Sequence, residues 1–177
     1  MNVLIRIRAC AAPFLDSVVG KPVWCLYTSD MDYKWAIEKG IAFAGRTEVQ
    51  VLDLKPGYVK MLMPLKPNLN HVGTMYAGAL FTLAELPGGA IFLSTFDSSR
   101  FFPLIKGMDI EFRKPAATDI TVEVRLDPEE AASIQAKADE LGKADYGWEC
   151  DLKDANDEIV AVSSNRYQLR SMKPPGA

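Results

Sequence analysis

The chain has 177 residues, of which 49% are hydrophobic and 24% are charged, and its formal net charge is −3. These proportions are typical of a globular protein whose one main domain encloses a substantial core. The charge shows no basic surplus, which argues against nucleic acid as a partner. The three cysteines have no ligand-like spacing, so we expect neither a disulfide framework nor a metal site. This cysteine usage is typical of a protein in a reducing compartment.

Residues 1–45 predict an N-terminal helical arm. Two arginines precede an apolar run, as in a signal peptide, but Pro13 and Asp16 interrupt that run. No segment is expected to approach the roughly 18 apolar residues of a membrane span. We therefore predict a cytoplasmic protein with no membrane partner. Ser29 can cap a helix that Gly40 ends.

Residues 46–170 predict the main domain, and residues 171–177 a C-terminal tail. Strands over Thr47–Leu54 and Tyr58–Met63 flank a Lys-Pro-Gly turn, which indicates a hairpin. Apolar and polar residues alternate again in four later segments, which predict four more strands. These segments are Met108–Phe112, Ile120–Leu126, Tyr146–Leu152 and Ile159–Leu169.

A helix is predicted between the strands that end at Leu126 and begin near Tyr146. Asp127 is suited to cap it, Pro128 to occupy its first position, and Gly142 to end it. We expect this helix to cover the sheet.

The segment from Asn70 to Glu85 reads N-H-V-G-T-M-Y-A-G-A-L-F-T-L-A-E. It predicts a turn followed by a helix from about Met75 to Phe92. That helix is apolar on all sides and rich in small residues, so it has to be enclosed by the sheet. Pro87 is expected to kink it. Runs of strands around one buried helix favour an α+β hotdog fold: a curved antiparallel sheet wrapped around a central helix.

Glu85 is the one carboxylate of this apolar helix, and desolvation is expected to raise its pKa, as a general base requires. Gly78, Phe81 and Glu85 share one helical face. The free N–H groups at the start of the helix can stabilise an oxyanion. Ala77 and Glu85 are about 12 Å apart along such a helix, at 1.5 Å per residue.

Asn70, Gly73, Gly78 and Glu85 resemble the signature of the hotdog acyl-CoA thioesterases of the phenylacetyl-CoA and 4-hydroxybenzoyl-CoA type. That signature is roughly N-x-x-G-x-x-H-G-G followed by a carboxylate in the next helix. The resemblance implies hydrolysis of an acyl thioester, carried by CoA or an acyl carrier protein, without a cofactor or metal.

The resemblance also implies residue roles. Glu85 corresponds to the base or nucleophile, Asn70 to the residue that positions the water or the substrate, and Ala77 to the first glycine, whose N–H polarises the carbonyl. Tyr76 stands where the family has His, and Ala77 where it has Gly. The candidate substrate-binding residues are Gly73, Tyr76, Gly78 and Phe81.

The resembled family works across a dimer interface. A two-fold homodimer with antiparallel helices brings Glu85 of one subunit to Asn70 and Ala77 of the other. We therefore expect a homodimer, and pairing of dimers into a tetramer stays open.

The sequence leaves other functions open. The Tyr76 and Ala77 departures leave open a hotdog protein that binds acyl thioesters without turnover. A hotdog dehydratase or hydratase requires a His–carboxylate pair, and His71 is the one histidine of the chain. Glu85 can also be an interface carboxylate in an ion pair, and Asn70 a turn residue. Four cations are either solvated or contacts for CoA phosphates: Lys66, Arg100, Arg113 and Lys114.

Overall fold

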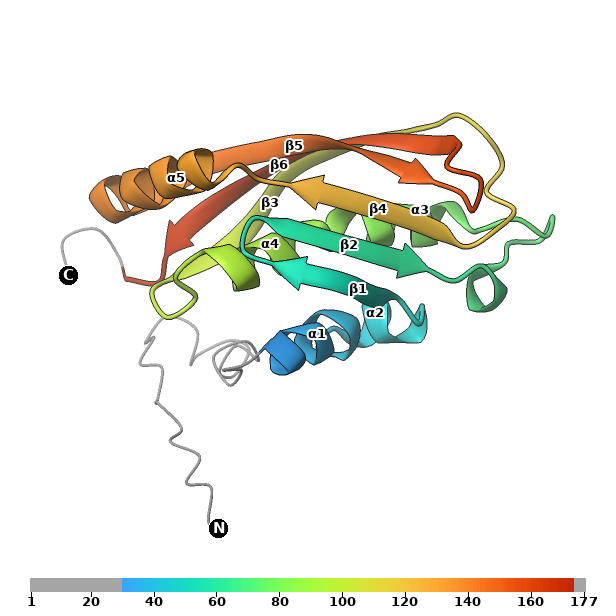
Figure 1. Cartoon of the computed structure of the whole chain (residues 1–177), viewed down its shortest axis with the longest axis horizontal. Coiled ribbons are helices and arrows are strands. Elements are labelled where there is room, and N and C mark those ends of the chain that lie inside the picture. Colours follow the sequence, from blue (N-terminus) through green and yellow to red (C-terminus); the bar gives the residue numbers. More distant parts are fainter. Residues whose placement is uncertain (1–29, 174–177) are drawn as a thin grey trace, which may run out of the picture.

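The structure is a computed structural model that describes residues 30–173 (Figure 1). Its six strands form one antiparallel sheet in the order β1-β2-β4-β5-β6-β3. The strands are β1 (Gln50–Lys55), β2 (Tyr58–Met63), β3 (Phe101–Phe112), β4 (Ile120–Arg125), β5 (Lys143–Lys153) and β6 (Ile159–Ser171). The helices are α1 (Asp30–Lys39), α2 (Ala42–Arg46), the short 3-10 helix η2 (Lys66–Asn68), α3 (Ala77–Glu85), α4 (Pro87–Thr95) and α5 (Pro128–Leu141).

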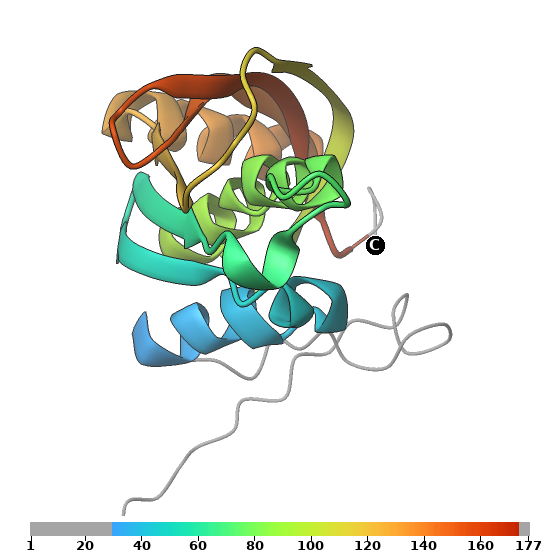
Figure 2. The same ribbon diagram turned by 90° about the vertical axis from the view of Figure 1, so that its right-hand side faces the viewer.

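The sheet curves around α3 and α4, which Figure 2 shows nearly end-on inside it. This confirms the predicted α+β hotdog fold. Helix α1 packs on β1 and α4, and α5 packs on β5 and β6. Ile37 of α1 and Ala44 of α2 belong to the same hydrophobic cluster as the sheet, so these two helices, the described part of the predicted arm, pack on the main domain. The exact division at residue 45 stays a prediction.

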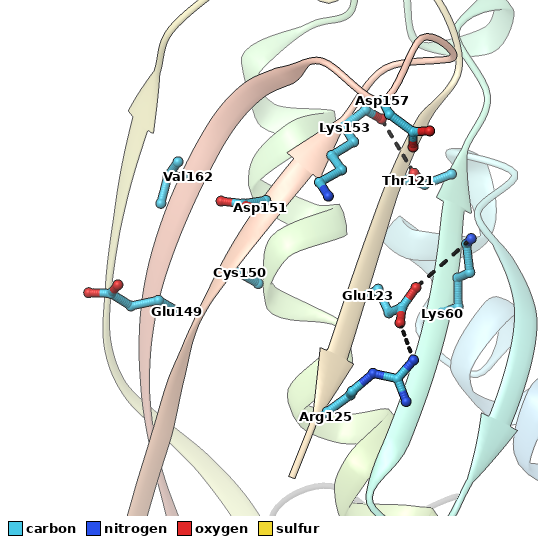
Figure 3. Close-up of a pocket in the computed structure, with 10 residues that line it drawn as sticks. All are labelled: Lys60, Thr121, Glu123, Arg125, Glu149, Cys150, Asp151, Lys153, Asp157 and Val162. Carbon is cyan, nitrogen blue, oxygen red and sulfur yellow. Dashed lines mark hydrogen bonds and ion pairs between the residues drawn. The ribbon is translucent and has the colours of Figure 1, made fainter.

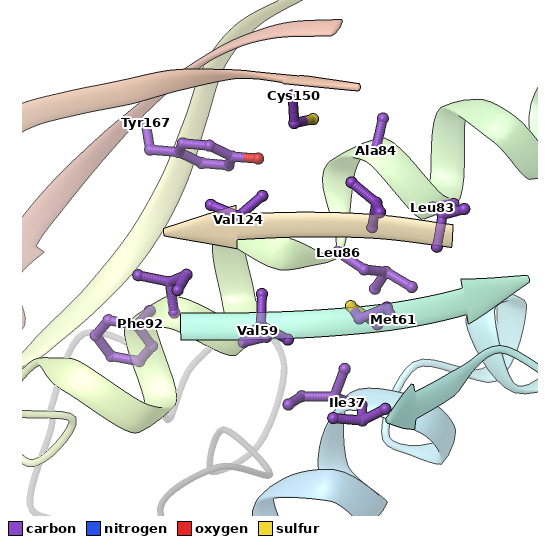
Figure 4. Packing of buried hydrophobic residues seen from close by; sticks show 14 of the residues in the cluster. Ile37, Val59, Met61, Leu83, Ala84, Leu86, Phe92, Val124, Cys150 and Tyr167 are labelled. Atoms are coloured by element: carbon purple, nitrogen blue, oxygen red, sulfur yellow. The ribbon is translucent and has the colours of Figure 1, made fainter. Parts of the chain in front are cut away.

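The core fills the space between the sheet and the central helix (Figure 4). Every second residue of β2 and β4 points inward and is buried, including Val59, Met61 and Val122. Leu83 and Phe92 meet them from the helix. The alternation seen in the sequence therefore sets which face of each strand touches the helix.

The first strand begins later than predicted, at Gln50 instead of Thr47. Thr47 ends α2, because its N–H and its hydroxyl both donate to the carbonyl of Ala44. Glu48 then takes a left-handed conformation with φ 58°, which separates helix from strand. At the opposite edge, β3 begins at Phe101 instead of Met108. The predicted Ser29 cap lies outside the described residues.

The single helix predicted over Met75–Phe92 is two segments in the structure. It starts only at Ala77, because the N–H groups of Met75 and Tyr76 donate to Ala116 and Asn68 outside the helix. It is interrupted at Leu86, directly before Pro87, as expected from a residue without an N–H.

The expectation that no segment resembles a membrane span in length and apolarity is wrong. Ala77–Thr95 meets both criteria, although 61% of its most apolar window is buried inside the protein. Core helices pass the same test, so this finding is weak support for a membrane span.

The signals that predicted α5 are confirmed. The Asp127 carboxylate accepts hydrogen bonds from the N–H groups of Glu129 and Glu130. Gly142 ends the helix in a left-handed conformation with φ 70°.

Candidate active site

The loop from Asn70 to Tyr76 is organised by the side chain of Asn70. Its Oδ1 accepts hydrogen bonds from the N–H groups of Val72, at 2.9 Å, and Thr74, at 3.1 Å. Its Nδ2 donates to Thr74 Oγ1 at 2.9 Å and to the Met75 carbonyl at 3.4 Å. Both ends of the amide are therefore engaged within the loop.

Gly73 lies at the point where this loop reverses. Its φ is +82°, a backbone conformation that residues with a Cβ rarely adopt, and its N–H donates to the Asn70 carbonyl. The Asn-x-x-Gly spacing thus has a local structural reason that is independent of catalysis.

The loop delivers the chain to the start of α3 with free backbone donors. Tyr76 precedes the helix in an extended conformation, and its carbonyl accepts from Ala79. Within residues 30–173, no hydrogen bond uses the N–H of Ala77 or Gly78. The Tyr76 ring lies over Gly78, where an added Cβ would collide with it. Tyr76 itself is 59% exposed.

One face of α3 is left open by the sheet. Ala77 and Phe81 are exposed, the latter by 44%, and Gly78 and Glu85 are half-buried, whereas the other residues of α3, such as Leu80 and Leu83, are buried in the core. The expectation that the helix is enclosed on all sides is therefore wrong for this face. Along it Ala77, Phe81 and Glu85 follow at intervals of four, which places them in one row.

Burial raises the pKa of the Glu85 carboxyl above its ordinary value, as predicted. Within the described part of the chain, no hydrogen bond or ion pair reaches this carboxylate. Desolvation without a compensating cation is the situation that favours a proton-accepting carboxylate at neutral pH.

The structure brings only some of the predicted site residues together. Asn70, Gly73, Tyr76, Ala77 and Gly78 lie at the start of α3, with Phe81 one turn further. Glu85 is the last residue of α3 and Ala77 is the first, so the acid and the amide donors lie at opposite ends of one helix.

Three buried polar residues near Glu85 were not predicted from the sequence: Ser163, Asn165 and Tyr167 on β6. Asn165 Nδ2 donates to the carbonyl of Ala84 at 3.0 Å, and the Tyr167 hydroxyl to the carbonyl of Glu85 at 3.1 Å. They occupy alternate positions that face the core. Polar residues at such positions of the last predicted strand were the available signal.

A separate hollow lies on the outer face of the sheet, where β4 and β5 diverge after two paired residues (Figure 3). Its charged side chains point away from the central helix. Lys60 and Arg125 both form ion pairs with Glu123 there. The mixed charges of this hollow give no chemistry comparable to the open face of α3.

The four candidate cations differ in their partners. Arg100 pairs with Asp97 and Asp139, Arg113 with Glu111, and Lys114 with Glu158. Among residues 30–173, Lys66 has no such partner, and it lies just before the Asn70 loop. His71 is exposed in that loop. No group of three or more His, Cys, Asp or Glu residues in the described region is placed to hold a metal ion.

Several solved structures are similar to this one. A protein of unknown function from Pseudomonas aeruginosa, called a probable thioesterase, is 50% identical, with a TM-score of 0.78 over 81% of this chain and 97% of that one. A thioesterase from Haemophilus influenzae shares the fold at 10% identity, with a TM-score of 0.63 over 85% and 96% of the two chains. No curated protein matches.

A family model described as "Domain of unknown function (DUF4442)" matches residues 33–167. That span contains the Asn70 loop, the central helix and all of β1 to β5. The chain therefore belongs to the DUF4442 family, and its structure is a hotdog fold.

Proposed function

We propose that the protein hydrolyses acyl thioesters, with Glu85 as the general base, at a site shared by two copies of the chain. One observation carries the proposal: Glu85 is a half-buried carboxylate with a raised pKa and no ion-pair partner among the described residues, on the open face of the central helix. The 50% identical Pseudomonas aeruginosa protein called a probable thioesterase supports the reaction class.

The second copy is required by the length of α3. Ala77 and Glu85 are separated by about 12 Å along the helix axis, at 1.5 Å per residue, so one subunit cannot place both at one carbonyl. A two-fold axis through the open face, with the two copies of α3 antiparallel, places Glu85 of each copy near the first turn of the other.

Strand β3 offers the surface for this pairing. It is an edge strand of twelve residues with no neighbour on its outer side in the described part of the chain. On the face of β3 that turns toward the central helix, Ile105 and Phe112 remain 44% and 49% exposed. An exposed edge of this length with apolar residues favours association. We propose a homodimer through β3 and α3, and leave tetramer formation to measurement.

In the proposed reaction, the N–H groups of Ala77 and Gly78 in one subunit bind the thioester carbonyl oxygen. Glu85 of the other subunit accepts a proton from water, whose oxygen attacks the carbonyl carbon. The tetrahedral oxyanion collapses, the carbon–sulfur bond breaks, and the proton passes from Glu85 to the leaving thiolate. The products are a carboxylic acid and a free thiol.

The roles of Asn70, Gly73, Tyr76 and Phe81 follow from their positions. Asn70 and Gly73 shape the loop that presents the donors, because the Asn70 amide is engaged within that loop. Tyr76 and Phe81 are exposed on the open face and provide apolar surface for the acyl group. CoA or an acyl carrier protein as the thiol, the phenylacetyl-CoA or 4-hydroxybenzoyl-CoA subtype, and a cytoplasmic location belong to the same proposal.

Binding of acyl thioesters without turnover is the second candidate. It is favoured by one observation, the exposed Tyr76 at the position where the resembled family has His. A dehydratase or hydratase is less well supported, since His71, the one histidine of the chain, has no carboxylate partner among residues 30–173.

The test is hydrolysis of a panel of acyl-CoA esters by the purified protein and by Glu85→Gln. The variant keeps size and removes the base, so we expect turnover to fall by about 1,000-fold or more while the oligomer persists. Glu149→Gln, on the exposed outer face of β5, is the control and keeps full activity. Undiminished hydrolysis by Glu85→Gln, or full activity of a monomer, contradicts the proposal.

A further inference from the structure

We infer that Tyr167 and Asn165 are positioning residues, which hold the interruption of the central helix and so aim Glu85 at the acyl carbonyl. The inference rests on the proposed hydrolase. It assigns a function to these two buried residues of β6, which the reaction itself does not use.

The interruption lies beside carbonyl groups that the sheet bonds directly. Pro87 has no N–H, so the helical hydrogen bond that residue 87 would donate to the carbonyl of Leu83 is missing. The next two carbonyls, those of Ala84 and Glu85, accept hydrogen bonds from the side chains of Asn165 and Tyr167. Side chains of the sheet thus bond the two residues on which the orientation of the Glu85 side chain depends.

Asn165 is itself fixed in orientation. It is 1% exposed, and its Oδ1 accepts a hydrogen bond from the Ser163 hydroxyl at 2.8 Å. The carbonyl of Ala84 can only accept, so it faces Nδ2, and the Ser163 hydroxyl then holds the other end of the amide. β6 pairs with β5 on one side and β3 on the other, which makes it an interior strand of the sheet.

Tyr167 is fixed by aromatic neighbours and by a glycine. Its ring stacks on Tyr146 with centroids 5.5 Å apart, and Trp148 lies 4.8 Å away. An added Cβ at Gly88 would collide with the Tyr167 ring, so glycine at that position is what lets the ring reach the helix. Figure 4 shows the Tyr167 ring among the buried side chains of this region.

Glu85 is held by its backbone on one side and presents its side chain on the other. The Glu85 carbonyl is held by the sheet, while its side chain lies on the open face where the substrate is proposed to bind. A proline and two glycines follow, which by themselves leave the helix free to bend. A displacement of about 1 Å in a catalytic group can cost about 100-fold in rate, so fixing this turn matters for catalysis.

The experiment compares two variants that each remove one buried hydroxyl. Tyr167→Phe removes the donor to Glu85 and keeps the stacked ring. Tyr146→Phe is the matched control, because the Tyr146 hydroxyl is buried next to Tyr167 without a hydrogen-bond partner in the described structure. Steady-state hydrolysis of acyl-CoA and its pH dependence are measured for both, with the oligomeric state.

We expect Tyr167→Phe to lower kcat by about 10- to 100-fold at a KM within about two-fold of wild type. The acidic limb of its kcat profile moves to lower pH, because a released Glu85 regains water. Tyr146→Phe changes neither. Should Tyr167→Phe not fold, Ser163→Ala is measured instead, since it releases the Asn165 amide, and a fall in kcat of about 10-fold is expected.

Two outcomes separate the inference from the function on which it rests. Wild-type kcat and pH profile in Tyr167→Phe, beside an inactive Glu85→Gln, overturn the positioning role alone. Absence of wild-type turnover across the panel overturns the hydrolase and the inference with it.

Discussion

Two irregular segments flank α3, and they are held in different ways. The loop before the helix is organised by Asn70, whose side-chain partners all lie within five residues of it. The interruption after the helix is bonded by Asn165 and Tyr167, which are 81 and 82 residues away along the chain. The first segment is a local structure on the exposed end of the helix, whereas the second exists only once β6 has packed on the helix.

In the helix turn that follows each segment, a glycine lies beneath a tyrosine ring. Gly78 lies under Tyr76, which is largely exposed, and Gly88 lies under Tyr167, which is 2% exposed. The same steric requirement is thus met at a surface where the ring can move and in a core where it cannot. A methyl group added to each glycine measures this difference.

Gly88→Ala is expected to have the largest effect on stability. The added methyl group collides with the buried Tyr167 ring, and overpacking of this kind costs about 1–3 kcal/mol of unfolding free energy. Gly78→Ala is the matched variant, for which the exposed Tyr76 ring turns away and the change stays within about 1 kcal/mol. Chemical denaturation of both proteins provides the values. Equal losses would mean that Tyr76 is as constrained as Tyr167.

Asn70→Ala is expected to have an intermediate effect. It removes the four hydrogen bonds of the Asn70 side chain, and because the loop is partly exposed the loss of unfolding free energy is about 1–2 kcal/mol. Asn70→Asp keeps the acceptor for Val72 and Thr74 and should lose about half as much. If Asn70 acts by shaping the loop, kcat falls in the same order. An Asp variant as inactive as Ala, with the stability of wild type, would indicate direct contact of Nδ2 with the substrate.

The contrast between the two segments also explains what could be predicted from the sequence. The Asn70 loop, the Pro87 interruption and the caps of α5 depend on neighbouring residues, and each was found by its local pattern. The hotdog fold followed from the order of alternating strands around one apolar helix. The predicted start of β1 was wrong because Thr47 bonds the carbonyl of Ala44 at the end of α2 and does not pair in the strand. The alternation of apolar and polar residues does not reveal this hydrogen bond.

The candidate site was predictable only in part. Glu85 and its raised pKa followed from a carboxylate in an apolar helix. The open face of α3 did not, because apolarity on all sides does not distinguish contact with the chain's own sheet from contact proposed with a second copy. Asn165 and Tyr167 were missed since their partners are carbonyls of distant residues, and a carbonyl has no sequence signature.

The smallest effect on stability is expected from Glu85→Gln, and unlike the other substitutions it should raise the free energy of unfolding. Because burial raises the pKa of Glu85, the folded protein binds the proton more tightly than the unfolded chain does, so stability is lost as the pH rises through the raised pKa. Glu85→Gln has no charge to bury. Its unfolding free energy should equal that of wild type near pH 4 and exceed it slightly at pH 8, as measured by urea denaturation at both values. Glu149→Gln is the control: the Glu149 carboxylate is already exposed to water, so its removal should cause no such difference between the two pH values.

If Glu85→Gln is instead less stable than wild type at pH 8, the Glu85 carboxylate has a cationic partner in the assembled protein. Glu85 is then part of an interface ion pair instead of a base.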